Sequence, residues 1–278
     1  GTTAPDKLLN DQGLTDQGLE FRFKPFLSLE PGLVLKGLRT SLGLTDATGL
    51  TLNGNTLLVD GVLHGDQADS LARLSGVHPL IGVVDLTGTK LNEEEALQLA
   101  RMHLDPPGSI ELATTDGRIT VSGHSSVAWY LEKSATPQVF GGWNVDFSPL
   151  LKALQTALQA RAEELNGTAF FFTTSDRLTP ESMSSLDAFA QQLSGLLNSS
   201  APLGSSMTVT LAGQADGTGT AEQNELTSRK RVKVVRDKLL SAGIDPEIIQ
   251  SLYLEWNRGN EDLAQRRVTI QITGDDRS

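Results

Sequence analysis

The chain has 278 residues, of which 38% are hydrophobic and 21% charged, so it is long enough to form two globular domains or three small ones. Its formal net charge of −11 argues against nucleic acid as a partner, because such binding requires cations that neutralise phosphates. The same charge argues against docking on an anionic membrane surface.

The residues that could ligate metals or act as nucleophiles are few. Cysteine is absent, which excludes disulfides, thiolate metal sites and cysteine nucleophiles. The four histidines show no ligand spacing such as H-x3-H, and no apolar run reaches the roughly 18 residues needed to span a bilayer. We therefore predict no metal site and no cofactor. The sequence starts at Gly1 and not at methionine, which is consistent with a targeting or membrane segment upstream.

Residues 1–25 are polar and rich in Gly, Asp and Gln, and we expect them to be a flexible linker. From there to residue 147 the sequence contains an imperfect internal repeat, in which the Pro-Gly segment 29–35 recurs as 104–112. Each copy continues with a turn signal, Asn53-Gly54 in the first and Asp116-Gly117 in the second, followed by an alternating strand. These turns predict a β-hairpin in each copy.

After the first hairpin, residues 66–74 have a helical pattern and residues 83–86 form an apolar run of strand type. A β–β–α–β unit of this kind resembles the BON domain, a small module of cell-envelope proteins. The resemblance covers residues 26–147 as two β-rich copies and depends on glycine turns and apolar alternation. It implies a protein partner in the cell envelope. In the second copy Trp129 and Trp143 have no counterpart, and we expect them to pack in the core.

The C-terminal part has an alternating strand and helix pattern. The apolar pattern of residues 148–165 predicts a connecting helix, with Ser148 as the N-cap and Pro149 in its first turn. Strands are predicted over 168–172, 207–212 and 267–272. Helices are predicted over 180–197, with Thr179 as the N-cap, and over 224–242, ended by Gly243. Residues 166–278 are thus predicted to form a mixed α/β domain.

One acid and one arginine lie fifteen positions apart across the predicted strand-to-helix turn of this domain. Asp216 is in the turn and Arg231 is on the helix that follows. A carboxylate can hold an ammonium while a guanidinium binds a carboxylate with two parallel hydrogen bonds. The pair therefore indicates binding of a small zwitterion. At 100° per residue, Asn224, Ser228 and Arg231 lie within about 60° of one another on the helix.

Four segments follow one another in this part of the chain: residues 170–181, 213–219, 224–235 and 266–268. They read FFFTTSDRLTPE, GQADGTG, NELTSRKRVKVV and RRV. In order and spacing they resemble the OmpA-like peptidoglycan-binding domain of flagellar stator proteins and Pal-type lipoproteins. Gln214 and Ala215 depart from the family's G-H-T-D turn, and the segment 254–260 before the last strand is shorter than in the family.

The resemblance implies that Asp216 and Arg231 clasp the diaminopimelate of peptidoglycan stem peptides, with Asn224, Ser228 and Gly219 as further ligand-binding residues. Two simpler interpretations of the same residues stay open. An Asp-Gly pair is often only a turn, and the basic run 229–236 is typical of a solvated helix face.

We therefore expect a fold of the α+β class: two small BON-like modules followed by an OmpA-like α/β sandwich. The expected protein is a non-catalytic periplasmic protein of a Gram-negative cell envelope, associated with the outer membrane, that anchors to peptidoglycan. It is not an enzyme, because no nucleophile, base or carboxylate pair can be assembled. The alternative is a scaffold of a secretion or stator-like assembly, in which the OmpA-like domain binds protein instead of the cell wall. The oligomeric state is not predicted.

Overall fold

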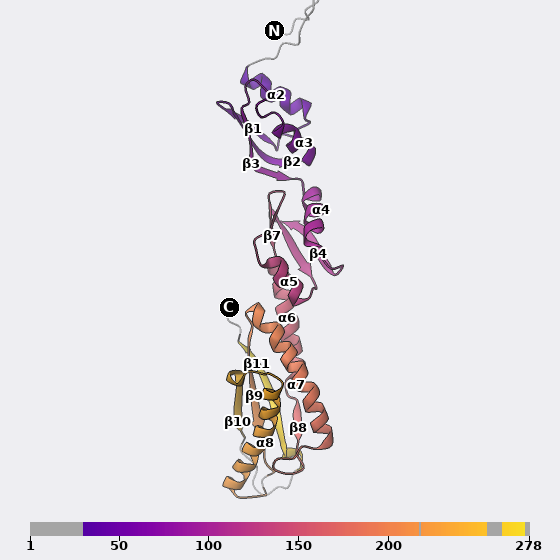
Figure 1. Ribbon diagram of the computed structural model, residues 1–278, viewed down its shortest axis with the longest axis vertical. Helices are drawn as coiled ribbons and strands as arrows, with labels where there is room; N and C mark the ends of the chain where they lie inside the picture. Colours follow the sequence, from indigo (N-terminus) through magenta and orange to yellow (C-terminus); the bar gives the residue numbers. More distant parts are fainter. Residues whose placement is uncertain (1–29, 217, 255–262, 276–278) are drawn as a thin grey trace, which may run out of the picture. The chain divides into compact units, whose positions relative to one another are not determined.

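The computed structural model describes residues 30–216, 218–254 and 263–275 (Figure 1). The chain divides into two compact units, and the boundary between them in the sequence falls between Glu95 and Ala96. In the described ranges the strands form one three-stranded and two four-stranded sheets, so no single sheet runs through the chain. None of the helices in these ranges is both long and apolar enough to cross a membrane. The predicted linker 1–25 lies outside the described residues.

The first unit folds as helix, hairpin, helix and strand. Its elements are α2 (Pro31–Ser41), β1 (Gly49–Asn53), β2 (Thr56–Leu63), α3 (Gly65–Ala72) and β3 (Val83–Leu91). Strand β2 is central, with β1 antiparallel on one side and β3 parallel on the other. The buried side chains Leu57, Val59 and Leu63 of β2 pack with Leu71 of α3 and form the core of this unit.

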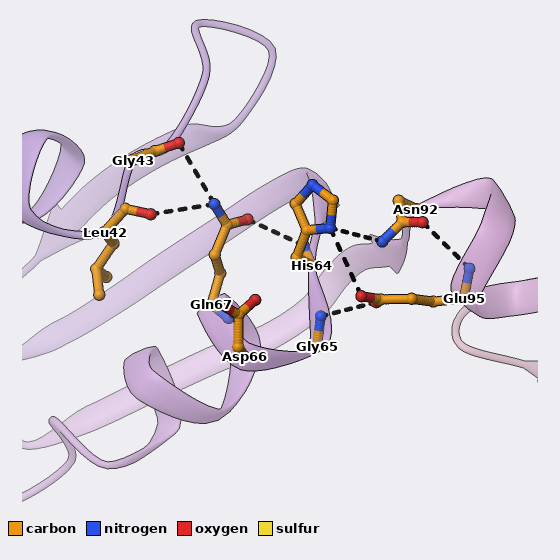
Figure 2. Close-up of polar contacts among 8 residues, drawn as sticks. All are labelled: Leu42, Gly43, His64, Gly65, Asp66, Gln67, Asn92 and Glu95. Carbon is orange, nitrogen blue, oxygen red and sulfur yellow. Dashed lines mark hydrogen bonds and ion pairs between the residues drawn. The ribbon is translucent and has the colours of Figure 1, made fainter.

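A polar network joins the beginning of α3 to the residues that precede and begin helix α4 (Glu93–Leu104), as Figure 2 shows. The Glu95 carboxylate accepts a hydrogen bond from the backbone N–H of Gly65 at 2.8 Å. Asn92 Oδ1 accepts from the N–H of Glu95, and Asn92 Nδ2 lies 2.9 Å from His64 Nδ1. Gln67 Oε1 accepts from the N–H of His64. Glu95, in the acidic first turn of α4, therefore also satisfies an N–H at the start of α3.

The second sheet follows α4 and is built from β4 (Ile110–Thr115), β5 (Arg118–Gly123), helix α5 (Val127–Ser134), β6 (Val139–Phe140) and β7 (Trp143–Asp146). Three strands of the second sheet pair as the three strands of the first do, and a fourth strand, β6, lies at the edge beside β7. Strand β5 pairs antiparallel with β4 and parallel with β7, as β2 does with β1 and β3. The predicted hairpins are present in both copies, with Gly54, Asp116 and Gly117 at positive φ in the turns. Trp143 is buried, as expected.

The alignment of the two Pro-Gly segments was wrong. Pro31 and Gly32 begin helix α2, whereas Pro107 and Gly108 lie in the loop between α4 and β4. Proline is tolerated in the first turn of a helix because its missing N–H would be unpaired there. The first copy has more residues between its Pro-Gly pair and its hairpin than the second, because that stretch contains most of α2 and the loop that follows it.

One pair of glycines, which occupy equivalent positions in the two sheets, shows the correspondence between the two copies more reliably than the Pro-Gly segments. Gly61 in β2 and Gly123 at the end of β5 have φ values of +92° and +103°. A Cβ atom would lie 2.3 Å from the carbonyl oxygen of Ala47 in the first case and 2.2 Å from that of Ser109 in the second. Both positions therefore require glycine for the same two reasons, backbone conformation and a close carbonyl.

The third sheet belongs to the C-terminal domain. Its elements are α6 (Ser148–Leu165), β8 (Ala169–Phe171), α7 (Pro180–Ser200), η2 (Ala201–Leu203), β9 (Ser206–Gly213), α8 (Ala221–Ser241), η3 (Pro246–Ile248), β10 (Ile249–Tyr253), η4 (Leu263–Gln265) and β11 (Arg267–Asp275). The strand order is β10-β9-β11-β8. Strand β11 is antiparallel to both β9 and β8, and β10 is parallel to β9. Helices α7 and α8 pack on each other and on the sheet (Figure 1).

The helix predictions for this part of the chain are confirmed, with small differences at their ends. Thr179 caps α7 by accepting from the N–H of Ser182. Helix α8 starts three residues earlier than predicted, because Thr220 and Gln223 form a capping box. Ser148 is the first residue of α6 and not its N-cap. Helix α6 packs on β5 of the second sheet and on α7 of the C-terminal domain. Strand β10 was not predicted.

Candidate functional site

The predicted site residues come together at one end of the third sheet. Asp216 follows strand β9, and Arg231 is on helix α8, which crosses that sheet. Because β11 is antiparallel to β9 and β8, its first residues lie beside the last residues of both strands. Arg266, which directly precedes β11, is brought to the same place by this pairing.

Arg231 is buried, with 3% of its surface exposed, so the interpretation as a solvated helix face is wrong for this residue. Its Nη1 donates to the carbonyl of Gln214 at 2.8 Å, and its Nε donates to the carbonyl of Thr174 at 3.3 Å. The guanidinium carbon lies 5.7 Å from the centre of the Phe172 ring. Within the described ranges no carboxylate forms an ion pair with it.

Burial lowers the pKa of Arg231 from its usual value; the charge of Asp216 opposes this shift and the charge of Arg266 adds to it. An arginine side chain nevertheless stays protonated in proteins. Helix α8 therefore carries a permanent, buried positive charge, whose direct contacts among the described residues are two backbone carbonyls and an aromatic ring.

Asp216 is also buried, with 7% of its surface exposed, and its main partner is Arg266. Both Nε and Nη2 of Arg266 lie 2.6 Å from Asp216 Oδ2, and the Thr218 hydroxyl donates to Oδ1 at 3.2 Å. Burial by itself would raise the pKa of Asp216, but the hydrogen bonds and charge of Arg266, together with Thr218, hold it below its usual value. The carboxyl group is therefore ionised at neutral pH.

The other three predicted residues support the loop and the strand. Asn224 Nδ2 donates to the carbonyl of Gly219 at 3.3 Å, which closes the loop onto the first turn of α8. Ser228 is 2% exposed, and its hydroxyl has no hydrogen-bond partner in the part of the chain that the structure describes. A Cβ on Gly213 would lie 2.7 Å from that hydroxyl oxygen, so Ser228 faces the backbone of β9.

The structure therefore brings Asp216 and Arg231 together and adds one residue that the sequence reasoning did not select. Arg266 was noticed only as part of the closing R-R-V motif. It stands fifty positions after Asp216, and only the antiparallel pairing of β9 with β11 makes the two neighbours. Counting side-chain charges, the three residues carry two positive charges and one negative charge.

The segment 255–262, which contains Trp256 and most of the shortened loop, lies outside the described residues. Tyr253, at the end of β10, lies under the guanidinium of Arg229, whose carbon is 4.5 Å from the ring centre. In the described part of the chain, no cluster of three His, Asp or Glu side chains could hold a metal ion.

The fold and the site define a small α/β domain with a buried acid and a buried arginine at the end of its sheet. Residues 170–273 match the model of the OmpA family. This C-terminal region is therefore an OmpA-like domain; the match covers less than half of the chain.

Several solved structures are similar to this region. The peptidoglycan-associated lipoprotein from Burkholderia pseudomallei is 20% identical, with a TM-score of 0.31, over 38% of this chain and 89% of that one. The C-terminal domain of Helicobacter pylori MotB is 16% identical, with a TM-score of 0.32, over 39% and 86% of the two chains. The OmpA-like domain of FopA1 from Francisella tularensis is 19% identical, with a TM-score of 0.29, over 38% and 70%. A search of curated proteins gave no match. No catalytic family is indicated.

Proposed function

We propose that the protein is a non-catalytic component of the bacterial cell envelope that attaches to peptidoglycan in the periplasm. In this proposal its OmpA-like domain holds the diaminopimelate end of an uncrosslinked stem peptide. Asp216 binds the ammonium of that end and Arg231 binds its carboxylate. Asn224 and Gly219 shape the loop around the ligand, and Ser228 supports the strand behind it.

The observation that carries the proposal is the environment of Arg231. A buried charge without a counter-ion is costly, and a ligand carboxylate would supply the missing partner. The second terminal nitrogen, Nη2, forms no hydrogen bond with any described residue, whereas Nη1 and Nε are already used. Arg231 therefore retains donors for a carboxylate, and its hydrogen bonds to Gln214 and Thr174 hold it in place beforehand.

The proposal is tested by retention of the protein on purified sacculi. We expect retention on diaminopimelate-type sacculi and poor retention on lysine-type sacculi, because lysine offers an ammonium without the carboxylate that Arg231 would bind. Arg231→Met removes the charge but fills most of the volume. Since hydrogen bonds to charged groups contribute roughly 1.5–3 kcal/mol, Arg231→Met should weaken binding about ten- to a hundredfold, and Asp216→Asn should weaken it as far as the carboxylate holds the ligand ammonium.

Arg229→Met is the matched control, because Arg229 is an arginine on the same helix with an exposed side chain that pairs with Glu225. It should bind sacculi as the unmodified protein does. Equal retention of all variants on both kinds of sacculi would reject the diaminopimelate site, provided that hydrogen exchange shows each variant to be folded.

Two observations favour a second function. Asp216 is already paired with Arg266, and Gln214 and Ala215 replace the His and Thr of the family pattern. An OmpA-like domain with these changes could instead serve as a protein-binding module of an envelope assembly. In that case the unmodified protein would not be retained on either kind of sacculi, and crosslinking in cells would join this domain to a protein.

The region 26–147 is proposed to be the tandem BON-like part that contacts another envelope protein. The supporting observation is an uncovered sheet face in the first unit. Leu58 and Val62 of β2 and Val83 of β3 lie on the face opposite the core and are 38%, 45% and 51% exposed. Apolar side chains gathered on an exposed sheet face are typical of protein interaction sites. Crosslinking from Val62 in cells tests this part of the proposal.

A further inference from the structure

We infer that Arg266 determines the ligand specificity of this site: its guanidinium takes the place beside the Asp216 carboxylate that a ligand ammonium would take, so that ligands are selected mainly through their carboxylate. The inference rests on the proposed function, because it concerns the same site. It differs from that proposal in assigning the ammonium a minor share of the binding energy.

The geometry of the pair supports this assignment. Arg266 places two nitrogens at 2.6 Å from Oδ2 of Asp216, and Thr218 occupies Oδ1. Charge-assisted bonds of this length are among the strongest hydrogen bonds in proteins. An arriving ammonium would have to displace a guanidinium or share the carboxylate with it at close range, where like charges repel.

The main chain around Arg266 is fixed. Its carbonyl accepts from the N–H of Phe172 at 2.8 Å, and its N–H donates to the carbonyl of Leu263 at 3.1 Å. The side chains of the pair are largely buried, with 24% of Arg266 and 10% of Asp216 exposed. Arg266 is thus part of the wall of the site and does not reach Asp216 from a distant surface position.

The charge balance points in the same direction. With Asp216 neutralised by Arg266, the charge of Arg231 is left in excess, and the charges of Arg231 and Arg266 are close enough to affect each other. A carboxylate beside Arg231 is therefore attracted by both arginines. An ammonium in the same pocket is attracted by one carboxylate and repelled by two guanidinium groups.

The test compares two soluble stem peptides with the full chain. The first ends in meso-diaminopimelate, and the second ends in 2-aminopimelate, which keeps the distal carboxylate but lacks the distal ammonium. Calorimetric titration should give affinities of the unmodified protein for the two peptides within about threefold of each other. In Arg266→Gln, Asp216 is freed, and the diaminopimelate peptide should bind about tenfold or more tightly than the aminopimelate peptide.

Two variants serve as controls. Arg266→Lys keeps the positive charge beside Asp216, so its ratio of affinities should stay near that of the unmodified protein. Arg229→Gln changes an exposed arginine of α8 and should leave both affinities unchanged. If Arg266→Gln is unfolded, Arg266→Lys together with the ratio measured for the unmodified protein still decides the question.

The outcomes separate this inference from the proposed function. A tenfold preference of the unmodified protein for the diaminopimelate peptide, or a ratio that Arg266→Gln leaves unchanged, would overturn the inference while the wall-binding proposal stands. If neither peptide binds to the unmodified protein or to Arg266→Gln, the proposed function fails and the inference fails with it.

Discussion

The two halves of the buried face of helix α8 have opposite chemistry. The first half carries Asn224, Ser228 and Arg231, and the second carries Val232, Val235 and Leu239. All six are at most 5% exposed. The apolar half belongs to the core of the C-terminal domain. The polar half contains a hydroxyl and a guanidinium that have, among the described residues, no hydrogen-bond partner and no paired carboxylate respectively, and both reduce stability. Equal burial thus serves packing in one half and, in the proposed function, a binding site in the other.

The largest expected effect lies in the apolar half. Leu239 is fully buried, so Leu239→Ala should lower the free energy of unfolding by about 2–5 kcal/mol through lost burial and the cavity left behind. Urea denaturation combined with hydrogen exchange of the α8 amides measures this change. Leu226→Ala is the control on the same helix, where the leucine is 59% exposed, and it should change stability by less than about 0.5 kcal/mol.

The contact between strand β9 and the middle of this face, where the two halves meet, should be nearly as sensitive. A Cβ on Gly213 would lie 2.5 Å from Val232 Cγ2 and 2.7 Å from Ser228 Oγ. Gly213→Ala should therefore cost about 1–3 kcal/mol, because the helix must move away from the strand. In Gly195→Ala, on α7, the added methyl group meets nothing within 4 Å, and this change should stabilise the protein by roughly 0.5–1 kcal/mol. Thermal unfolding of both variants compares the two positions, and equal effects would contradict the close approach.

A smaller effect is expected for the ion pair. Asp216→Asn should lower stability at neutral pH by roughly 1–2 kcal/mol, since the charge-assisted bonds to Arg266 are lost. The pKa of Asp216 is lowered in the folded state, so its stabilising contribution is present above the unfolded pKa of about 3.9 and is lost as the pH falls through the folded value. The difference in free energy of unfolding between the unmodified protein and Asp216→Asn should therefore decrease as the pH falls below about 4. A difference that persists at a pH below the folded pKa would show that the carboxylate contributes through packing and not through its charge.

The smallest effect is expected at Ser228. Its hydroxyl is buried without a partner among the described residues, so Ser228→Ala removes a desolvation cost and a close approach to β9 at once. Stability should stay within about 1 kcal/mol of the unmodified protein, in the stabilising direction, and binding to sacculi should be unchanged. A loss of binding with stability preserved would instead place the hydroxyl in contact with the ligand.

Much of the C-terminal fold could be predicted from the sequence because its elements are long and periodic. Helices α6, α7 and α8 each extend over at least 18 residues, and Thr179 with Pro180 is a strong start signal. Strand β10 was missed because it is a five-residue edge strand that follows a short 3-10 helix directly, without alternation of its own. Helix α2 was missed because Pro31-Gly32 is also a turn signal, and only tertiary packing decides between the two.

The candidate site could be predicted in part, for a similar reason. Asp216 and Arg231 are fifteen positions apart, in a turn and on the helix that follows it, so two consecutive elements of the chain hold them. Arg266 is joined to Asp216 only by the register of β9 with β11, and no periodicity of the sequence contains that information. Likewise, the burial of Arg231 within a run of basic residues follows from the packing of α8 on the sheet and not from its composition.

The short strand β8 has a mechanical consequence. The chain arrives from α6 beside Ile270, where the N–H of Gly167 donates to its carbonyl, and the candidate site lies at the opposite end of the strand, where Phe172 bonds Arg266. In an anchor of the proposed kind, tension between the wall and the preceding chain would therefore act along β8. The bonds between β8 and β11 are perpendicular to that direction, so they share the force in shear and must break together. This geometry resists pulling better than a strand that is peeled off one bond at a time.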